Sequence, residues 1–451
     1  MSVLASFILL NGLAFTHVTV VPMDSDRVLG DQAVVVAGDR IVSMGPADRV
    51  RLPAGVRRID GAGRYLVPGL VDAHVHIPPE ASDEAAAAKE FLLFVAHGVT
   101  TARVMIGQPE HLALRAAITR GALLGPALFV ASPPLGVKVG SLPGVPEIAS
   151  PEDARRFALQ AKQAGYDGVK LLDGMSRAEY EAFVAGAREA GLPVWGHVPD
   201  AVGLARALEL KQDSIEHLAG YLEALIPDAS PLKKQEVVRL ADAMAALDED
   251  LLPGLARATR EAGVVSVPTL DFWRALVNAE TPEELGLRPG LEYVPAQQRA
   301  EWAEQQRKAR ERNPRPRELV ERYHALRARI VRALRDAGAP IALGTDSPDV
   351  WNVAGVAALE ELRRLGEAGL TPREALHAAT RGAAELLGGE KEFGSVAPGL
   401  RADLVLLEAD PLADVRNLGR RAGVVVRGRW LPEPELRERL LALATEAKPS
   451  P

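Results

Sequence analysis

Cysteine is absent from this chain of 451 residues. Its absence excludes disulfides, thiolate nucleophiles and zinc sites built on cysteine, so any metal must be held by histidine, carboxylate or modified lysine side chains. Aromatic residues are also few, at 4% of the chain, and 53 Lys and Arg residues against 60 Asp and Glu residues give a net charge of −7. Without a basic surface or enough aromatic rings to stack bases, nucleic-acid binding is not expected.

Long apolar runs are missing as well, because no stretch approaches the roughly 20 residues that a membrane-spanning helix needs. The first fifteen residues are mostly apolar, yet no Lys or Arg precedes Arg27, and the pair Asn11-Gly12 interrupts the run. This pattern does not favour an export signal. It predicts strands over residues 3–10 and 13–21, joined at the Asn-Gly turn. We therefore expect a cytoplasmic protein without membrane contact.

The length and the ordinary globular composition predict one large domain with a smaller companion. Short β-branched runs fill the region between residues 13 and 59, and similar runs recur at residues 402–407 and 423–429. We expect the two ends of the chain to pair in a small β-sandwich formed by residues 1–65 and 391–451. Residues 66–390 form the second predicted domain.

Within residues 66–390, strand-like runs alternate with helical patterns, which indicates a parallel (β/α)8 or TIM barrel of the α/β class. Helix starts are marked by Ser150-Pro151 and by capping boxes beginning at Ser176 and Thr371. Residues 270–340 exceed what a barrel needs. We expect the first part to act as a lid or to set substrate size at the catalytic mouth, or else the segment to be an outer helical decoration or a contact between subunits. The eight predicted strands cover residues 66–75, 98–105, 127–132, 168–172, 193–197, 214–218, 264–269 and 340–347.

His74 and His76 end the first of these strands. Residues two apart on a strand face the same way, so the two imidazoles can reach one ion. By itself a His-x-His pair is weak evidence. Active sites of parallel barrels form where the strands end. Four further residues stand at the ends of other predicted strands and are expected to converge with the first two: Lys170, His197, His217 and Asp346.

Each of these residues also has a purely structural interpretation. Lys170 could pair with a buried carboxylate, His197 could be a core histidine, and Asp346 could cap the helix that follows it. Their joint occurrence at strand ends favours a metal site over these alternatives. Imidazole and carboxylate ligands suit zinc first, with manganese, cobalt or iron as alternatives.

In this order and context, the six residues resemble the metal site of the amidohydrolase superfamily, in its imidazolonepropionase-like and prolidase-like branch. The resemblance covers nearly the whole chain and implies a terminal β-sandwich around a central barrel, with residues 394–403 as the segment that re-enters the sandwich. It further implies that Lys170 reacts with CO2 to form a carbamate that bridges two divalent ions. His74, His76 and Asp346 would join Lys170 at one ion, and His197 and His217 would join it at the other.

The activity that the resemblance implies is hydrolysis of a C–N bond. A metal-bound hydroxide would attack the carbonyl with Asp346 as the general base, and the leading substrate is a dipeptide or an N-acyl amino acid. A lactam, lactone or ester substrate is the alternative. Deamination ranks lower, because His197 is followed by Val198-Pro199-Asp200 and not by the glutamate typical of related deaminases. A non-catalytic scaffold is a further alternative, against which the complete ligand set argues.

Substrate contacts are not fixed by the sequence, although Arg103, Lys138 and Tyr221 are candidates for binding a substrate carboxylate. Asp72 is expected to support His74 or to pack beneath the ligands. We also expect a small-molecule substrate and assembly of the chain with copies of itself. The remaining histidines lie outside the strand ends and are interpreted as surface or packing residues: His17, His97, His111, His324 and His377.

Overall fold

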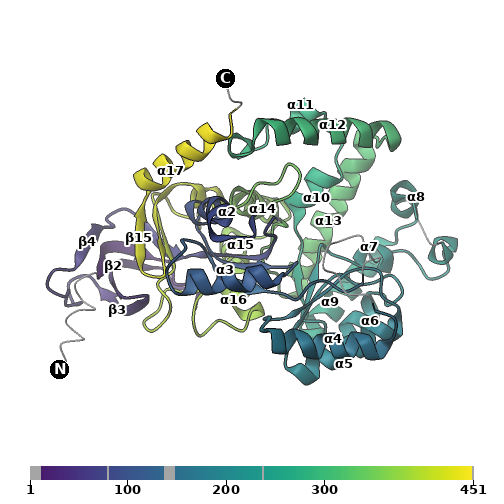
Figure 1. Ribbon diagram of the computed structural model, residues 1–451, viewed down its shortest axis with the longest axis horizontal. Helices are drawn as coiled ribbons and strands as arrows, with labels where there is room; N and C mark the ends of the chain where they lie inside the picture. The colour runs from purple at the N-terminus through teal and green to yellow at the C-terminus, as the bar shows by residue number, and fades with distance from the viewer. Residues whose placement is uncertain (1–11, 79–80, 137–147, 236–237, 449–451) are drawn as a thin grey trace.

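The computed structural model describes residues 12–78, 81–136, 148–235 and 238–448. Strands from both ends of the chain form one sheet at the side of the molecule, and helices surround a set of parallel strands in the remainder (Figure 1). The strand predicted over residues 3–10 lies outside the described residues. Among the described residues, no helix is both long and apolar enough to cross a bilayer.

In the described part of the chain, the terminal domain contains eight strands: β1 (Leu13–Val20), β2 (Leu29–Ala37), β3 (Arg40–Pro46), β4 (Arg57–Asp60), β5 (Tyr65–Pro68), β13 (Leu404–Leu407), β14 (Arg421–Val426) and β15 (Arg429–Pro432). They follow the order β15-β14-β13-β5-β1-β2-β3, with β4 beside β1. Phe15, Val34, Leu66 and Leu404 are fully buried in its core. Because β13 pairs with β5 and β5 pairs with β1, strands from both ends of the chain share one sheet.

The strand predicted over residues 66–75 is divided at Gly69. Its first part, β5, belongs to the terminal sheet, and its second part, β6 (Leu70–Val75), pairs with the next strand of the barrel. A Cβ atom at Gly69 would lie 2.1 Å from Oγ1 of Thr100, so only glycine permits this close approach. The chain therefore passes from one domain into the other within a single apolar run.

Among the described residues, the barrel contains seven regular strands: β6, β7 (Val99–Val104), β8 (Ala127–Val130), β9 (Val169–Leu171), β10 (Val194–Gly196), β11 (Ser214–Glu216) and β12 (Val265–Val267). Neighbours in this series pair in parallel in two groups, β6 to β8 and β9 to β12. A bridge between Ala131 and Gly168 joins the two groups. These parallel strands and the sheet shared by the two ends agree with the predicted α/β class, a (β/α)8 barrel with a small β-sandwich from both termini.

The eighth predicted strand, residues 340–347, closes the barrel without forming a regular ladder. Ile341 bridges to Ser266 within β12, and Ser347 bridges to Val75 at the end of β6. The amide of Thr345 is bonded to the Asp72 side chain at 3.0 Å, in addition to a carbonyl of β6. This side-chain contact interrupts the ladder at the point where Asp346 leaves the strand.

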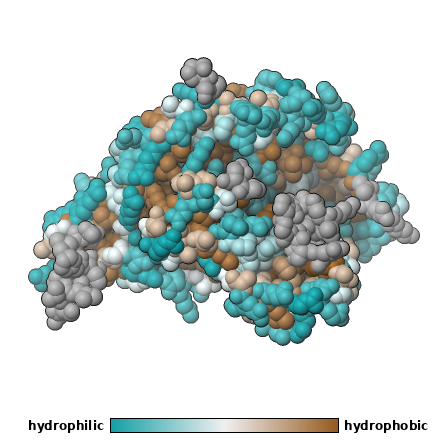
Figure 2. All heavy atoms as spheres, viewed as in Figure 1, coloured by the Kyte–Doolittle hydropathy of each residue, from teal (hydrophilic) through white to brown (hydrophobic). Residues whose placement is uncertain are grey.

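The helices α4 (Pro151–Ala164), α5 (Arg177–Ala190) and α15 (Pro372–Ala378) begin where their caps were predicted, and the side chains of Ser150, Ser176 and Thr371 each accept a backbone N–H. Figure 2 shows hydrophilic side chains over the outer faces of the helices and hydrophobic ones gathered toward the middle of the molecule. The other long helices around the barrel are α2 (Glu84–Ala96), α3 (Pro109–Thr119), α9 (Leu252–Ala262) and α14 (Val356–Glu367), and α17 (Glu433–Glu446) follows β15.

The long segment after β12 forms α10 (Leu270–Leu276), α11 (Pro282–Leu285), α12 (Ala296–Arg312) and α13 (Arg317–Ala337). Its first helix and α13 contribute walls of the cavity at the carboxyl ends of the strands. Helix α12 has no buried residue and lies along the top of the molecule in Figure 1. The structure thus places α10 and α13 at the catalytic cavity, and Gln298 and Trp302 of α12 line a neighbouring cavity, while a role of the segment as a lid or as decoration stays a prediction.

Candidate metal centre

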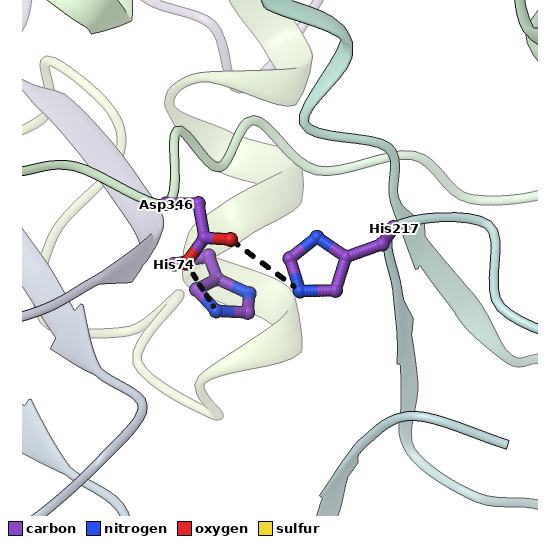
Figure 3. Close-up of side chains that lie close together, drawn as sticks. All are labelled: His74, His217 and Asp346. Atoms are coloured by element: carbon purple, nitrogen blue, oxygen red, sulfur yellow. Dashed lines mark ion pairs between the residues drawn. The ribbon is translucent and has the colours of Figure 1, made fainter. Parts of the chain in front are cut away.

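The six predicted ligands line one cavity of about 520 Å³. His74 and Lys170 lie within β6 and β9, and His76, His197 and His217 immediately follow β6, β10 and β11. Asp346 lies near the end of the segment that closes the barrel. The parallel strands bring these positions together because their carboxyl ends share one face of the barrel. Figure 3 shows His74, His217 and Asp346 directed toward one another.

The carboxylate of Asp346 is the centre of the group. Its Oδ1 lies 2.6 Å from Nε2 of His76 and 3.2 Å from Nε2 of His74, and its Oδ2 lies 3.6 Å from Nε2 of His217. Donor atoms of His74, His217 and Asp346 all lie within 4.8 Å of one another. The His197 ring lies 4.9 Å from that of His217, centroid to centroid. The structure thus brings His74, His76, His217 and Asp346 together, whereas the prediction assigned His217 to the other ion.

Three of the imidazoles are oriented by a contact to their Nδ1 atom. Nδ1 of His74 lies 2.7 Å from Oε2 of Glu216, Nδ1 of His217 lies 2.7 Å from Oγ1 of Thr269, and Nδ1 of His197 lies 3.0 Å from the Asp173 carboxylate. A carboxylate at Nδ1 favours the tautomer with its proton there, which leaves Nε2 with a lone pair. Histidines that bind metals are usually oriented in this way.

The charge states in the cavity also fit a divalent cation. Burial lowers the pKa of His217 well below its usual value, and burial together with Lys170 lowers that of His197, so both rings are neutral at pH 7. Burial would raise the pKa of Asp346, but His74 and the hydrogen bonds from His74 and His76 hold it well below the usual value. Burial lowers the pKa of Lys170 to about 8, against Glu216 and Asp346. Neutral imidazoles, a carboxylate and a lysine with an accessible neutral form are a donor set that a divalent metal can use.

The backbone is held in an unusual conformation at this edge of the barrel. His217, Thr269 and Asp346 have φ angles of 61°, 47° and 58°, in the left-handed region that favours glycine. Such conformations persist only where the surrounding structure holds them, and they concentrate at functional sites. Here they turn two candidate ligands, His217 and Asp346, and the partner of one of them toward the same point.

Asp72 supports the ligands from below, as the sequence predicted. Its Oδ1 accepts the backbone amides of His74 at 3.2 Å and Thr345 at 3.0 Å, and its Oδ2 accepts the Thr345 hydroxyl at 2.6 Å. Burial raises the pKa of Asp72 to about 7. The side chain ties the strand that carries His74 to the segment that carries Asp346.

Glu216 was not predicted to take part in the site. Its carboxylate is completely buried and lies between His74 and Arg103, whose guanidinium is 2.8 Å from Oε1; the Ser214 hydroxyl also donates to it. Burial would raise its pKa, but Arg103 and His74 outweigh this and lower it to about 2. The signal in the sequence was the alternation Ser214-Ile215-Glu216, which places both polar side chains on one face of a strand.

Glu216→Gln is expected to weaken metal binding by roughly 10- to 100-fold, because the amide cannot accept from both His74 and Arg103 as the carboxylate does. It should also destabilise the protein by about 3–5 kcal/mol, since the Arg103 charge is left buried without its partner. Metal titration and thermal unfolding measure the two effects. Glu209→Gln, which changes an exposed glutamate paired with Arg206, is the control. Unchanged metal affinity in Glu216→Gln would contradict a supporting role for this residue.

Two of the three candidates for carboxylate binding are engaged inside the protein. The Arg103 guanidinium is fully buried, bonds to Glu216 and Ser214, and lies over the Trp195 ring. The Tyr221 hydroxyl lies 2.7 Å from Oγ1 of Thr259 and is also buried. These contacts exclude both from the substrate cavity. Lys138 lies outside the described residues.

The remaining histidines do not join the six ligands. His17 lies within β1 and pairs with Asp31, His97 and His324 bond to backbone carbonyls, and His377 is exposed and does not line the cavity. His111 is buried at the start of α3, where its Nδ1 accepts the Gln108 amide, and it lines a second cavity beside the candidate centre. The packing interpretation therefore holds, with His111 nearest to the site.

A comparison with known proteins places the chain in a family. The sequence profile of the amidohydrolase family matches residues 65–431. The chain belongs to the amidohydrolase family. It is 27% identical to the imidazolonepropionase of Streptomyces coelicolor over 413 residues, 89% of this chain and 90% of that protein. It is 28% identical to the imidazolonepropionase of Rubrobacter xylanophilus over 452 residues, 90% of this chain and 92% of that protein.

Solved structures of this family share the fold. Bottromycin amidohydrolase superposes with a TM-score of 0.74 at 27% identity, covering 96% of this chain and 90% of that one. A candidate prolidase from Bifidobacterium longum superposes with a TM-score of 0.70 at 27% identity, covering 97% and 99%. The predicted branch is thus confirmed, and this amidohydrolase is a hydrolase acting on C–N bonds.

Proposed function

We propose that this amidohydrolase uses two divalent metal ions, zinc being the first candidate, to hydrolyse the amide bond of a small molecule, with a dipeptide or an N-acyl amino acid as the leading substrate. The observation that carries the proposal is the convergence of six donor side chains on one cavity at the carboxyl ends of the barrel strands. His74, His76, Asp346 and Lys170 would hold one ion, and Lys170, His197 and His217 the other. Bound metal would supply Lewis acidity and lower the pKa of water.

The proton is moved by Asp346. Its carboxylate is ionised and lies in the cavity, so it can accept the proton of the attacking water and deliver it to the leaving amine. His74 and His217 restrain the carboxylate from two sides, which holds it in one orientation for both transfers. Lys170, through its neutral form, would take up CO2 as a carbamate and so become an anionic ligand.

The cavity has room for a substrate on both sides of the reacting bond. Phe272 and Trp273 of α10 and Tyr323 of α13 form an aromatic wall of the 520 Å³ cavity. A second cavity of about 750 Å³ adjoins it, and His76, Ile106 and Asp349 line both. Aromatic and aliphatic walls with a few polar groups are typical of small-molecule sites.

A second candidate is opening of a lactam ring or hydrolysis of an ester at the same site. It is favoured by the similarity to imidazolonepropionases over most of the chain, although relatives at 27% and 28% identity do not establish the substrate of this protein. Glu216 directly precedes His217, but its carboxylate is taken up by His74 and Arg103, so deamination gains no support from it. The complete donor set also disfavours a non-catalytic scaffold.

The test is hydrolysis of a substrate library. Protein reconstituted with zinc or manganese and bicarbonate is incubated with dipeptides and N-acetyl amino acids, and released amine is measured. We expect release that is lost after chelation and restored by metal. Hydrolysis of lactams or esters alone would move the assignment to the second candidate, and metal-loaded protein that is inactive on every class would contradict catalysis.

A further inference from the structure

Arg327 is a buried cation of the catalytic cavity that the proposed reaction leaves unused. It lies on α13 one turn after Tyr323, on the same face, and its side chain lines the cavity with only 5% of the residue exposed. One of its terminal nitrogens donates to the Pro268 carbonyl at 2.8 Å, just beyond the end of β12, and the other lies 3.3 Å from the Tyr323 hydroxyl. The guanidinium is therefore fixed at the carboxyl end of a barrel strand.

The Arg327 charge has no partner of opposite sign among the described residues. Its Nε atom is buried without a hydrogen-bond partner, and no carboxylate lies within ion-pairing distance of the guanidinium. The charges of Glu361 and Glu223 act on Arg327 only from beyond ion-pairing distance, and Glu361 uses both oxygens to accept the backbone amides of Leu270 and Asp271. Arg103, equally buried, has Glu216 as its partner. Buried cations are normally paired, so a bound molecule is expected to supply the anion that Arg327 lacks.

The position of Arg327 relative to the candidate metal centre suits a small substrate. Its guanidinium lies 4.7 Å from the centroid of the Trp273 ring, and the same ring lies 6.2 Å from that of His217, centroid to centroid. One aromatic side chain thus contacts both the cation and a candidate ligand. Of the described residues that line the cavity, only Lys170 and Arg327 are strong bases, and Lys170 belongs to the centre.

We infer that Arg327 binds a carboxylate of the substrate and selects amides that carry one close to the scissile bond. This inference rests on the proposed amide hydrolysis and names the group that the site recognises. A guanidinium can bind a carboxylate through two parallel hydrogen bonds, and both the unused Nε and the terminal nitrogens of Arg327 are donors. The flat faces of Trp273 and Tyr323 hold the guanidinium plane in place. N-acyl amino acids and dipeptides have the required carboxylate, and simple amides do not.

The test compares a substrate with its decarboxylated counterpart. We would measure kcat/KM for N-acetyl-L-leucine and for N-(3-methylbutyl)acetamide, and the stabilisation of the protein against heat by each compound. Wild-type protein is expected to prefer the acid by on the order of 100-fold. Arg327→Met should reduce that preference to near unity while hydrolysis of the uncharged amide continues. Arg327→Lys, which keeps the charge but not the paired hydrogen bonds, should show an intermediate preference.

The control is Arg274→Met, because Arg274 is on α10 beside Trp273 but pairs with Glu321 and does not line the cavity. Its preference for the acid should equal that of the wild type. An equal loss of both reactions in Arg327→Met and Arg327→Lys, or hydrolysis by wild type without preference for the acid, would overturn the inference. A different outcome would separate the two proposals. If the acid stabilised the wild-type protein but not Arg327→Met, and neither compound were hydrolysed, carboxylate binding by Arg327 would be supported and the proposed function contradicted.

Discussion

Replacing Asp346 by asparagine is expected to lower kcat on the best library substrate by a factor on the order of 10³, while metal content stays near that of the wild type. Asparagine keeps the shape of the side chain and one oxygen that can bind metal, but its amide cannot accept a proton. The substitution tests the carboxylate directly, because His76, His74 and His217 all approach its two oxygens. Elemental analysis and steady-state kinetics measure the two quantities on the same sample.

A matched control is available at the opposite end of the barrel. Asp213 directly precedes β11 and pairs with Arg188, so Asp213→Asn makes the same chemical change away from the cavity. It should keep nearly normal turnover. If Asp346→Asn also turned over normally with its metal in place, another group would have to serve as the base. If it lost its metal, the residue would be essential as a ligand and its role as the base would be unsupported.

Local rules predicted much of the fold. The caps at Ser150, Ser176 and Thr371 were predictable because a helix start depends on side chains within four residues of it. Strand ends were predictable for the same reason, and the carboxyl-end rule for barrels then brought six distant residues to one cavity. The division at Gly69 was not predictable, since it depends on the approach of Thr100 from another strand.

Long-range pairing limited the prediction of the site. Arg103 and Tyr221 were candidates because they carry polar groups near strand ends, yet each finds a partner inside the protein, Glu216 and Thr259 respectively. Arg327 was not considered, because α13 carries several arginines and the sequence does not show which of them is buried without a carboxylate to pair with. Whether a charge is paired depends on contacts between elements far apart in the chain, and only the folded arrangement supplies them.

Lys170→Ala is expected to remove one of the two proposed metal equivalents and nearly all turnover. Removing a residue that only orients a ligand typically lowers metal affinity or activity by roughly 10- to 100-fold. The effect of Lys170→Ala should be larger, because the proposed bridging ligand itself is lost. Burial lowers the pKa of Lys170 to about 8, so a usable fraction of its amine is neutral near pH 7, and only the neutral amine can bind CO2. Wild-type protein should accordingly take up less metal in buffer freed of CO2 than in bicarbonate.

The matched control is Lys162→Ala, which removes an exposed lysine of α4 and should leave metal content and activity unchanged. Small carboxylates provide a second check. The space vacated in Lys170→Ala lies in the cavity, so added acetate can supply the two oxygens that the carbamate would have offered, and partial recovery of metal uptake and turnover is expected. Full metal loading and full activity of Lys170→Ala without acetate would contradict a bridging lysine, and a single metal with unchanged turnover would indicate that one ion is sufficient for the chemistry.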